Sequence, residues 1–163
     1  TKSAVQGELG AILGKEGLLQ LKKGFDYTNL MTDPKQAKEF VTKTGIDTLA
    51  VSVGTIHGSF RGVEQIDVPR IHQIAKVFSV PLVLHGGSGN DSKALKRAIK
   101  AGICIINVDT DLRIALLEGL RRSLTNKTLA KHIDPRAIFT ASYAPMQAKA
   151  QAVMRLFGSS RQA

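Results

Sequence analysis

Three short apolar runs, each followed by glycine or polar residues, constrain the fold of this chain more than any other feature. The runs occupy 48–53, 81–84 and 103–108 and are separated by segments that carry helix signals. Apolar strands that alternate with helices are typical of a parallel sheet whose two faces are both covered. The sequence therefore predicts an α/β fold built on parallel strands.

The segments around the runs contain recognisable helix boundaries. Asp33-Pro34 supplies an N-cap followed by proline at the first helical position, and Gly45 ends that helix. Leucines at helical spacing predict another helix over 112–124. Further helices are predicted over 67–78 and 92–102, and a last one from Pro145 to Phe157, ended by Gly158.

Glycine-rich and polar motifs follow the apolar runs directly. Gly54-Thr-Ile-His-Gly58 follows the first run, His85-Gly-Gly-Ser-Gly89 the second, and Asp109-Thr-Asp111 the third. In parallel α/β folds the ligand site lies at the carboxyl ends of the strands, in a (β/α) barrel and in an open doubly wound sheet alike. The pattern favours an enzyme and leaves both architectures open.

The formal net charge of +10 over 163 residues suggests an anionic partner. Nucleic acid, phosphorylated metabolites and an evenly solvated surface each explain it. Because basic residues are spread without a dense run or interleaved aromatic residues, we expect no nucleic-acid partner. Without a signal peptide or an apolar run of about 20 residues, we expect a cytoplasmic protein with no membrane partner. Cys104 lies in an apolar run and is predicted to be buried.

Two histidines stand at equivalent places, each just past a predicted strand and each followed by glycine. A single histidine there is more often a packing residue than a metal ligand. His57 and His85 lie on neighbouring strand ends, which are about 4.8 Å apart in a parallel sheet, so their rings could converge on one zinc. A catalytic zinc needs three protein ligands, and only two are visible. His72 and His132 are predicted to be surface residues.

The residues after the second and third runs suit a phosphate site. Glycines in 86–89 allow backbone N–H groups to approach an anion at a helix start, although a tight turn explains them equally. Asn107 could contact the same ligand. Asp109 and Asp111 are alternatively helix caps, and Arg113 is alternatively a surface charge.

The first thirty residues differ from the rest. Glu8-Leu9-Gly10 ends a short strand, and the glycine-punctuated segment after it predicts a mobile active-site loop. We expect one domain made of this strand end and loop at 1–30, βα units at 31–125 and a C-terminal helical extension at 126–163.

The motifs around His57, at 81–89 and at 107–113 together resemble the class II, metal-dependent fructose- and tagatose-bisphosphate aldolases. The ending Arg155-Leu-Phe-Gly-Ser-Ser160 is similar to the C-terminus of such enzymes, and the likeness runs over almost the whole chain in order and spacing. It implies a (β/α)8 barrel, of which this chain holds the C-terminal half. It also implies reversible cleavage of fructose 1,6-bisphosphate into dihydroxyacetone phosphate and glyceraldehyde 3-phosphate. The implied cofactor is Zn²⁺, alone or together with a monovalent cation.

The resemblance also implies roles, partners and alternatives. His57 and His85 match zinc ligands, Glu8 matches a carboxylate that holds the metal in an alternative position, and Glu16 matches a loop glutamate that moves a proton; Glu16 is alternatively a solvated loop residue. The partners are sugar bisphosphates, triose phosphates and further copies of the chain in a dimer or tetramer. The alternatives are a tagatose 1,6-bisphosphate aldolase and a degenerate barrel that binds a phosphosugar without turnover. The residues implied in substrate binding are Gly58, Gly86, Gly87, Ser88, Asn107, Val108, Asp109, Thr110 and Arg113.

One match and two departures qualify the resemblance. Asp109 matches the fructose-type pattern and could discriminate between epimers through one sugar hydroxyl. Gln6 stands where the family usually has glutamate, and the Leu-Asp-His motif with the catalytic aspartate and the third zinc histidine is absent. We therefore expect residues before Thr1, and we expect residues 1–163 alone to be neither a stable fold nor active, because four strands leave two open sheet edges.

Overall fold

A computed structural model describes residues 3–12, 28–57, 66–160 and 162 of the chain. The chain divides into two compact units, residues 1–108 and 109–163. The expected organisation into segments 1–30, 31–125 and 126–163 stays a prediction.

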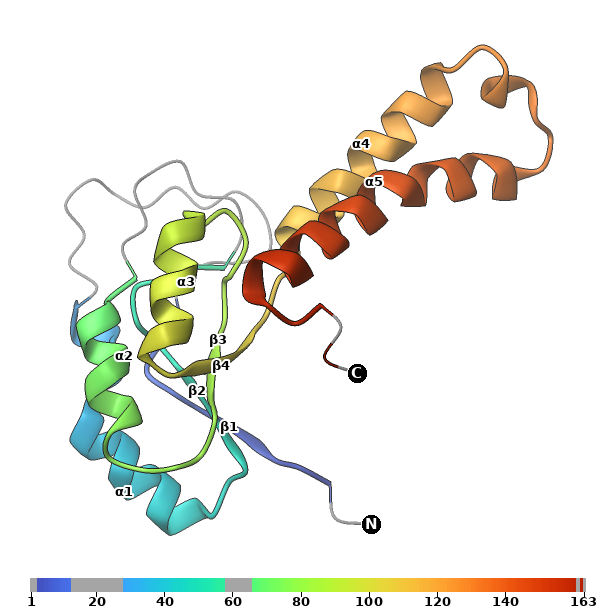
Figure 1. The fold of residues 1–163 in the computed structure, drawn as a ribbon. Coiled ribbons are helices and arrows are strands. Elements are labelled where there is room, and N and C mark those ends of the chain that lie inside the picture. The colour runs from blue at the N-terminus through green and yellow to red at the C-terminus, as the bar shows by residue number, and fades with distance from the viewer. Residues whose placement is uncertain (1–2, 13–27, 58–65, 161, 163) are drawn as a thin grey trace. The chain divides into compact units, whose positions relative to one another are not determined.

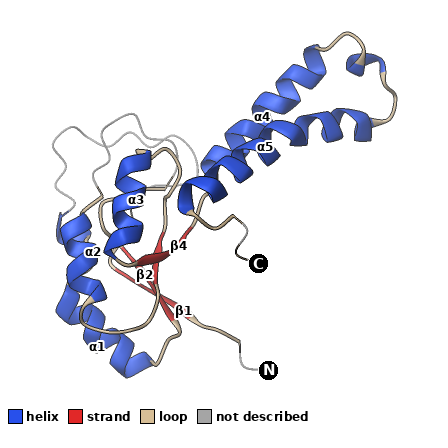
Figure 2. Ribbon diagram, in the orientation of Figure 1, coloured by secondary structure: helices blue, strands red, loops and turns tan. Residues whose placement is uncertain are grey.

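The first unit is built on a four-stranded parallel sheet (Figure 2). Its strands β1 (Gln6–Leu9), β2 (Thr48–Val51), β3 (Leu82–Leu84) and β4 (Ile103–Ile106) are neighbours in chain order, and every neighbouring pair is parallel. The short helix η1 (Thr28–Leu30) precedes the first long helix. The parallel α/β sheet predicted from the sequence is confirmed.

Three helices connect these strands and lie along one side of the sheet (Figure 1). They are α1 (Pro34–Thr44), α2 (Val68–Ala75) and α3 (Ser92–Ala101). Crossovers between parallel strands are right-handed, so strands in the order β1-β2-β3-β4 place all three helices on the same side. Asp33 caps α1 by accepting hydrogen bonds from the backbone nitrogens of Lys35 and Gln36, each at 2.9 Å. The predicted caps at Asp33 and Gly45 are confirmed, the latter with a left-handed φ of 63°.

The core lies between the sheet and these helices. Leu49 and Val51 of β2 pair with Leu82 and Leu84 of β3, and all four side chains are almost fully buried. Ile71 and Ile74 of α2 are completely buried. Each such side chain contributes about 1.5–3 kcal/mol of hydrophobic stabilisation, which fixes the strand ends in place.

The prediction that Cys104 is buried is wrong: the thiol is exposed. The register between β3 and β4 shifts by one residue, because Leu82 pairs with Ile103 whereas Val83 pairs with Ile105. Cys104 is the extra residue of this irregularity and has no partner on β3. β4 is also the last strand of the sheet in the described part of the chain, so an apolar run there is not covered as a central strand would be.

The second unit is a helical hairpin of α4 (Thr110–Thr125), the short helix η2 (Leu129–Lys131) and α5 (Pro135–Phe157). The two long helices run side by side (Figure 1). A Cβ atom on Gly119 of α4 would collide with the carbonyl oxygen of Ser142, so glycine permits this close approach. The hydroxyl of buried Ser142 donates to that of Ser123 at 3.2 Å.

The prediction that the last helix begins at Pro145 is wrong, because Pro145 lies inside α5. The helix begins at Pro135, where Asp134 accepts a hydrogen bond from the backbone nitrogen of Arg136 at 3.0 Å. Asp134-Pro135 is the stronger start signal, since proline at the first helical position loses no helical hydrogen bond. Of the described helices, none combines the length and apolarity that crossing a membrane requires.

Candidate metal and phosphate site

Two histidines meet at the carboxyl edge of the sheet. His85 directly follows β3, and His57 lies six residues beyond the end of β2. Both are half-buried, their ring centroids are 5.7 Å apart and their ring planes are inclined at 58°. The structure thus brings together the two side chains that the sequence singled out as metal ligands.

A close backbone approach sets this spacing. Gly86, which follows His85, has a left-handed φ of 66°. A Cβ atom there would collide with the carbonyl oxygen of Ile56, the residue before His57. The backbone after one histidine therefore lies directly against the backbone before the other, and only glycine permits the contact.

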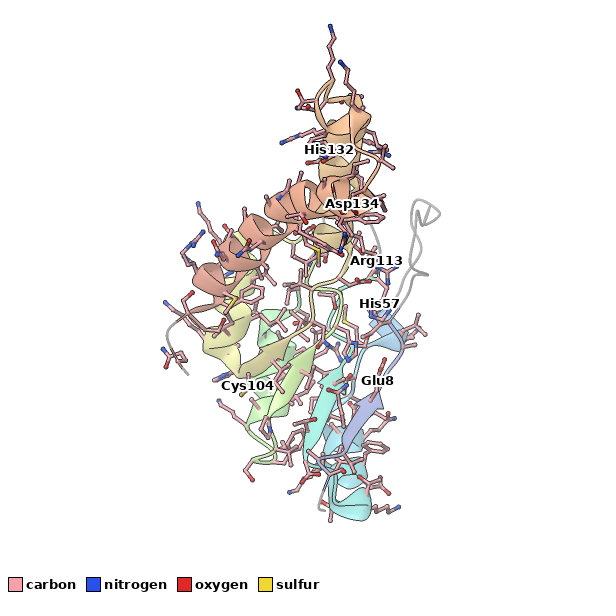
Figure 3. The ribbon with its side chains drawn as sticks, turned by 90° about the vertical axis from the view of Figure 1, so that its right-hand side faces the viewer. Glu8, His57, Cys104, Arg113, His132 and Asp134 are labelled. Atoms are coloured by element: carbon pink, nitrogen blue, oxygen red, sulfur yellow. The ribbon has the colours of Figure 1, made fainter. Side chains whose placement is uncertain are left out.

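The two rings fit a zinc ion in separation and chemistry. Zinc bonds of about 2.0–2.1 Å at a tetrahedral angle place two imidazole centroids about 5 Å apart, and imidazole nitrogen is a preferred zinc ligand. The observed 5.7 Å is close to that separation. In the described part of the chain, no group of three or more His, Cys, Asp or Glu side chains is arranged to hold a metal. Glu8 on β1 therefore does not complete such a group with His57 and His85. Glu8 and His57 are labelled in Figure 3.

Gln6 is a site residue that sequence reasoning did not assign. Its side-chain Nε2 lies 3.1 Å from Nε2 of His85. Gln6 precedes Glu8 by two residues on β1, so both side chains project from the same face of the sheet. The sequence showed only that glutamine replaces the family's usual glutamate at this position. It did not show that the side chain of Gln6 contacts His85.

The glycine loop after β3 is held by hydrogen bonds from two directions. The backbone nitrogen of Gly87 donates to the carbonyl oxygen of Asn107 at 2.9 Å, which ties the loop to the end of β4. The side-chain nitrogen of Asn90 donates to the carbonyl oxygens of Gly86 at 2.7 Å and Ser88 at 3.2 Å. Asn90 was missed from sequence, although asparagine commonly stabilises turns by such bonds. Since the N–H of Gly87 is already used, any anion would be bound by other groups of this loop.

Asp109 and Arg113 begin the second unit and form an ion pair there. Oδ1 of Asp109 accepts a hydrogen bond from Nε of Arg113 at 2.8 Å, and both side chains are about half exposed. Asp109 occupies the N-cap position of α4 but makes no side-chain capping hydrogen bond, so the alternative role as a cap is not supported. An exposed pair of this kind contributes little stability. Thr110 is the first residue of α4, and Val108 ends the first unit.

The remaining predicted residues fall into three groups. Glu16 and Gly58 lie outside the described residues. Asn107 is exposed at the end of β4, and Ser88 is buried in the glycine loop. His72 and His132 are exposed, as predicted, at α2 and at the end of η2.

Comparison with known proteins identifies the family. The family model described as class II fructose-bisphosphate aldolase matches residues 1–162. The chain belongs to the class II fructose-bisphosphate aldolase family. Membership explains why two histidines and a glycine-rich loop follow consecutive parallel strands, and it decides between the two architectures left open by the sequence in favour of the (β/α)8 barrel.

Solved structures of this aldolase family agree. The crystal structure of the YdjI aldolase from Escherichia coli K12 is similar, with 31% identity and a TM-score of 0.77, and the match covers 98% of this chain and 51% of that one. A candidate fructose-1,6-bisphosphate aldolase from Coccidioides immitis has 25% identity, a TM-score of 0.77 and coverage of 98% and 53%. A fructose-bisphosphate aldolase from Campylobacter jejuni, at 24% identity, a TM-score of 0.66 and coverage of 83% and 47%, supports the fold. The chain spans about half the length of these relatives.

Proposed function

We propose that the chain supplies the metal-binding half of a zinc-dependent aldolase that cleaves and forms fructose 1,6-bisphosphate. The observation that carries the proposal is the pair of histidine rings, 5.7 Å apart at the carboxyl edge of a parallel sheet. Parallel barrels build their active sites at this edge. A net charge of +10 suits substrates that carry two phosphate groups.

The proposed roles follow from the chemistry of each side chain. His57 and His85 would hold zinc, which when bound supplies a Lewis acid for the ketone oxygen of the substrate. Glu8, on β1, would offer a carboxylate to the metal in an alternative position. The backbone of Gly58 and Gly86 and the side chains of Ser88 and Asn107 would bind the dihydroxyacetone phosphate end. Gly87, whose N–H donates to the carbonyl oxygen of Asn107, would hold the loop in place. Glu16 would move the proton on the carbon next to the ketone.

Substrate choice is assigned to the segment after β4. We propose that Asp109 accepts a hydrogen bond from a sugar hydroxyl whose orientation differs between fructose and tagatose bisphosphate, flanked by Val108 and Thr110. Arg113, released from its exposed pair with Asp109, would bind the distal phosphate, since guanidinium groups make paired hydrogen bonds to phosphate oxygens. The motif from Asn107 to Arg113 supports this proposal.

The chain spans about half the length of its relatives, so we assign the catalytic aspartate and the third zinc histidine to the other half of the barrel. The two outer strands, β1 and β4, each have one neighbour in the described sheet. The other half would pair with both outer strands and close the sheet. The expectation that residues 1–163 alone are unstable and inactive stays a prediction.

Turnover by the full-length protein tests the proposal. Purified protein is assayed with fructose 1,6-bisphosphate and with tagatose 1,6-bisphosphate, before and after zinc is removed by a chelator and restored. The proposal predicts zinc-dependent cleavage with a higher kcat/KM for the fructose substrate. Preference for the tagatose substrate would assign the tagatose alternative. Binding of either sugar without cleavage would assign the degenerate barrel.

A further inference from the structure

We propose that Gln6 is a positioning residue for His85, and that its side-chain amide reserves Nε2 of the ring so that Nδ1 is the nitrogen that binds metal. The inference rests on the proposed role of His85 as a zinc ligand. Its basis is the 3.1 Å separation between Nε2 of Gln6 and Nε2 of His85. That distance is within hydrogen-bonding range, so one of the two ring nitrogens already has a partner from the protein.

The sheet geometry explains how Gln6 comes to face His85. A Cβ atom on Gly7 would lie 2.7 Å from side-chain atoms of Phe40 and Ile46, so Gly7 faces the helix side of the sheet. Side chains alternate along a strand, so Gln6 faces the opposite side. His85 is two residues beyond Val83, whose register partner on β2 is Ala50.

A small residue on the intervening strand makes the contact feasible. β2 lies between β1 and β3, and its residue in register with both Glu8 and Val83 is Ala50. Ala50 is fully buried and has only a methyl group. Larger side chains on β1 and β3 therefore have room to meet above β2.

The hydrogen-bond chemistry of the two groups determines what Gln6 does. A neutral imidazole carries a proton on one nitrogen and a lone pair on the other, and only the lone pair binds metal. If the amide nitrogen of Gln6 donates to Nε2, the ring proton is on Nδ1 and the ring presents no lone pair outward. A half-turn of the amide presents its oxygen instead, which accepts the Nε2 proton and leaves the Nδ1 lone pair for metal.

The amide thus suits both states of the ring. It accepts from His85 when metal is bound and donates to it when metal is absent. A carboxylate at position 6 could only accept, and it would make the ring a stronger ligand because its charge favours the protonated Nε2. Glutamine is expected to hold the ring in the same place as glutamate but with weaker zinc binding.

Zinc affinity in the full-length protein tests the inference. The zinc dissociation constant is measured by competition with a chromophoric chelator at fixed pH for the wild type, Gln6→Leu and Gln6→Glu. Leucine has similar size and no hydrogen-bonding group, so Gln6→Leu should weaken zinc binding by about 10–100-fold. Gln6→Glu should bind zinc at least as tightly as the wild type. Gln73→Leu, an exposed glutamine on α2, is the matched control and should leave the affinity unchanged.

A crystal structure of the zinc-loaded wild type gives a second readout that needs no variant. The inference predicts zinc on Nδ1 of His85 and the side-chain amide of Gln6 at Nε2. Zinc on Nε2, or a Gln6→Leu affinity within about twofold of the wild type, would overturn it, since a lost ligand-orienting contact changes affinity by about tenfold or more. If the inference about Gln6 fails while the proposed function holds, His85→Ala will still abolish zinc binding. If the proposed function fails, His85→Ala will leave zinc binding unchanged.

Discussion

A pair of glycine substitutions in the loop after β3 tests whether backbone contact sets the histidine spacing. Gly86 and Gly89 both have left-handed φ values, of 66° and 78°. They differ in their surroundings, because a Cβ atom on Gly86 would collide with the carbonyl oxygen of Ile56, whereas one on Gly89 meets nothing within 4 Å among the described residues. Gly86→Ala and Gly89→Ala therefore share the strain of the left-handed backbone, and only the first adds a collision.

The difference in unfolding free energy isolates the collision. Left-handed strain costs about 1–2 kcal/mol for alanine, and it applies to both variants. Forcing a methyl group against packed atoms costs about 1–3 kcal/mol in addition, and here the neighbour is backbone that cannot rotate away. Gly86→Ala should therefore destabilise the protein by about 1–3 kcal/mol more than Gly89→Ala.

Urea unfolding of the two full-length variants, followed by circular dichroism, measures this difference. Zinc affinity gives a second readout, because moving the backbone after His85 away from Ile56 should separate the two rings. Gly86→Ala should weaken zinc binding and Gly89→Ala should not. Equal losses of stability, with equal zinc affinities, would refute the argument that this contact positions the site.

Three further predictions concern other residues. Asp109→Ala should lower kcat/KM for fructose 1,6-bisphosphate more than for its tagatose epimer. The difference in transition-state stabilisation between the two substrates should be about 1–3 kcal/mol, as expected for one polar contact. An equal fall for both substrates would show that Asp109 does not determine substrate choice. Glu16→Gln should slow the exchange of the carbon-bound proton of dihydroxyacetone phosphate with solvent while zinc binding stays the same, and unchanged exchange would assign the proton step elsewhere. The pKa of Asp134 is held below its ordinary value of 3.8, first by the hydrogen bond from the Arg136 side chain and next by that from the Arg136 backbone N–H. Desolvation opposes this shift, and the charge of His132 is the smallest of the lowering effects. Its contribution to stability should be fully present above pH 3.8 and lost as pH falls through the lowered pKa, so carboxyl NMR should show Asp134 titrating below 3.8, and Asp134→Asn should remove this part of the acid dependence.

The sequence predicted the elements whose signals are local. Helix α1 begins after Asp33 and ends at Gly45, as the cap chemistry predicts, and three of the four parallel strands follow from apolar runs between helices. The same reasoning failed where two local signals competed. Pro145 gives a weaker start signal than Asp134-Pro135, which lies ten residues earlier and provides both a cap and a first-turn proline.

Features that depend on how the strands pair could not be predicted from the sequence. Whether Cys104 is buried depends on the register of β4 against β3, and the apolar run alone predicted burial. The approach of Gln6 to His85 joins residues that are 79 positions apart across an intervening strand. His57 and His85 could be anticipated because both follow strand ends, but their 5.7 Å spacing required the contact between Gly86 and Ile56.

Zinc content per chain tests the central claim most directly. Full-length wild type, His57→Ala, His85→Ala and His72→Ala are purified in the same way, and bound zinc is measured by mass spectrometry after exhaustive dialysis. His72 is an exposed histidine on α2 and serves as the control. The account predicts that wild type and His72→Ala carry a full complement of zinc and that each of the other two variants loses most of it. A full complement in both His57→Ala and His85→Ala would contradict it.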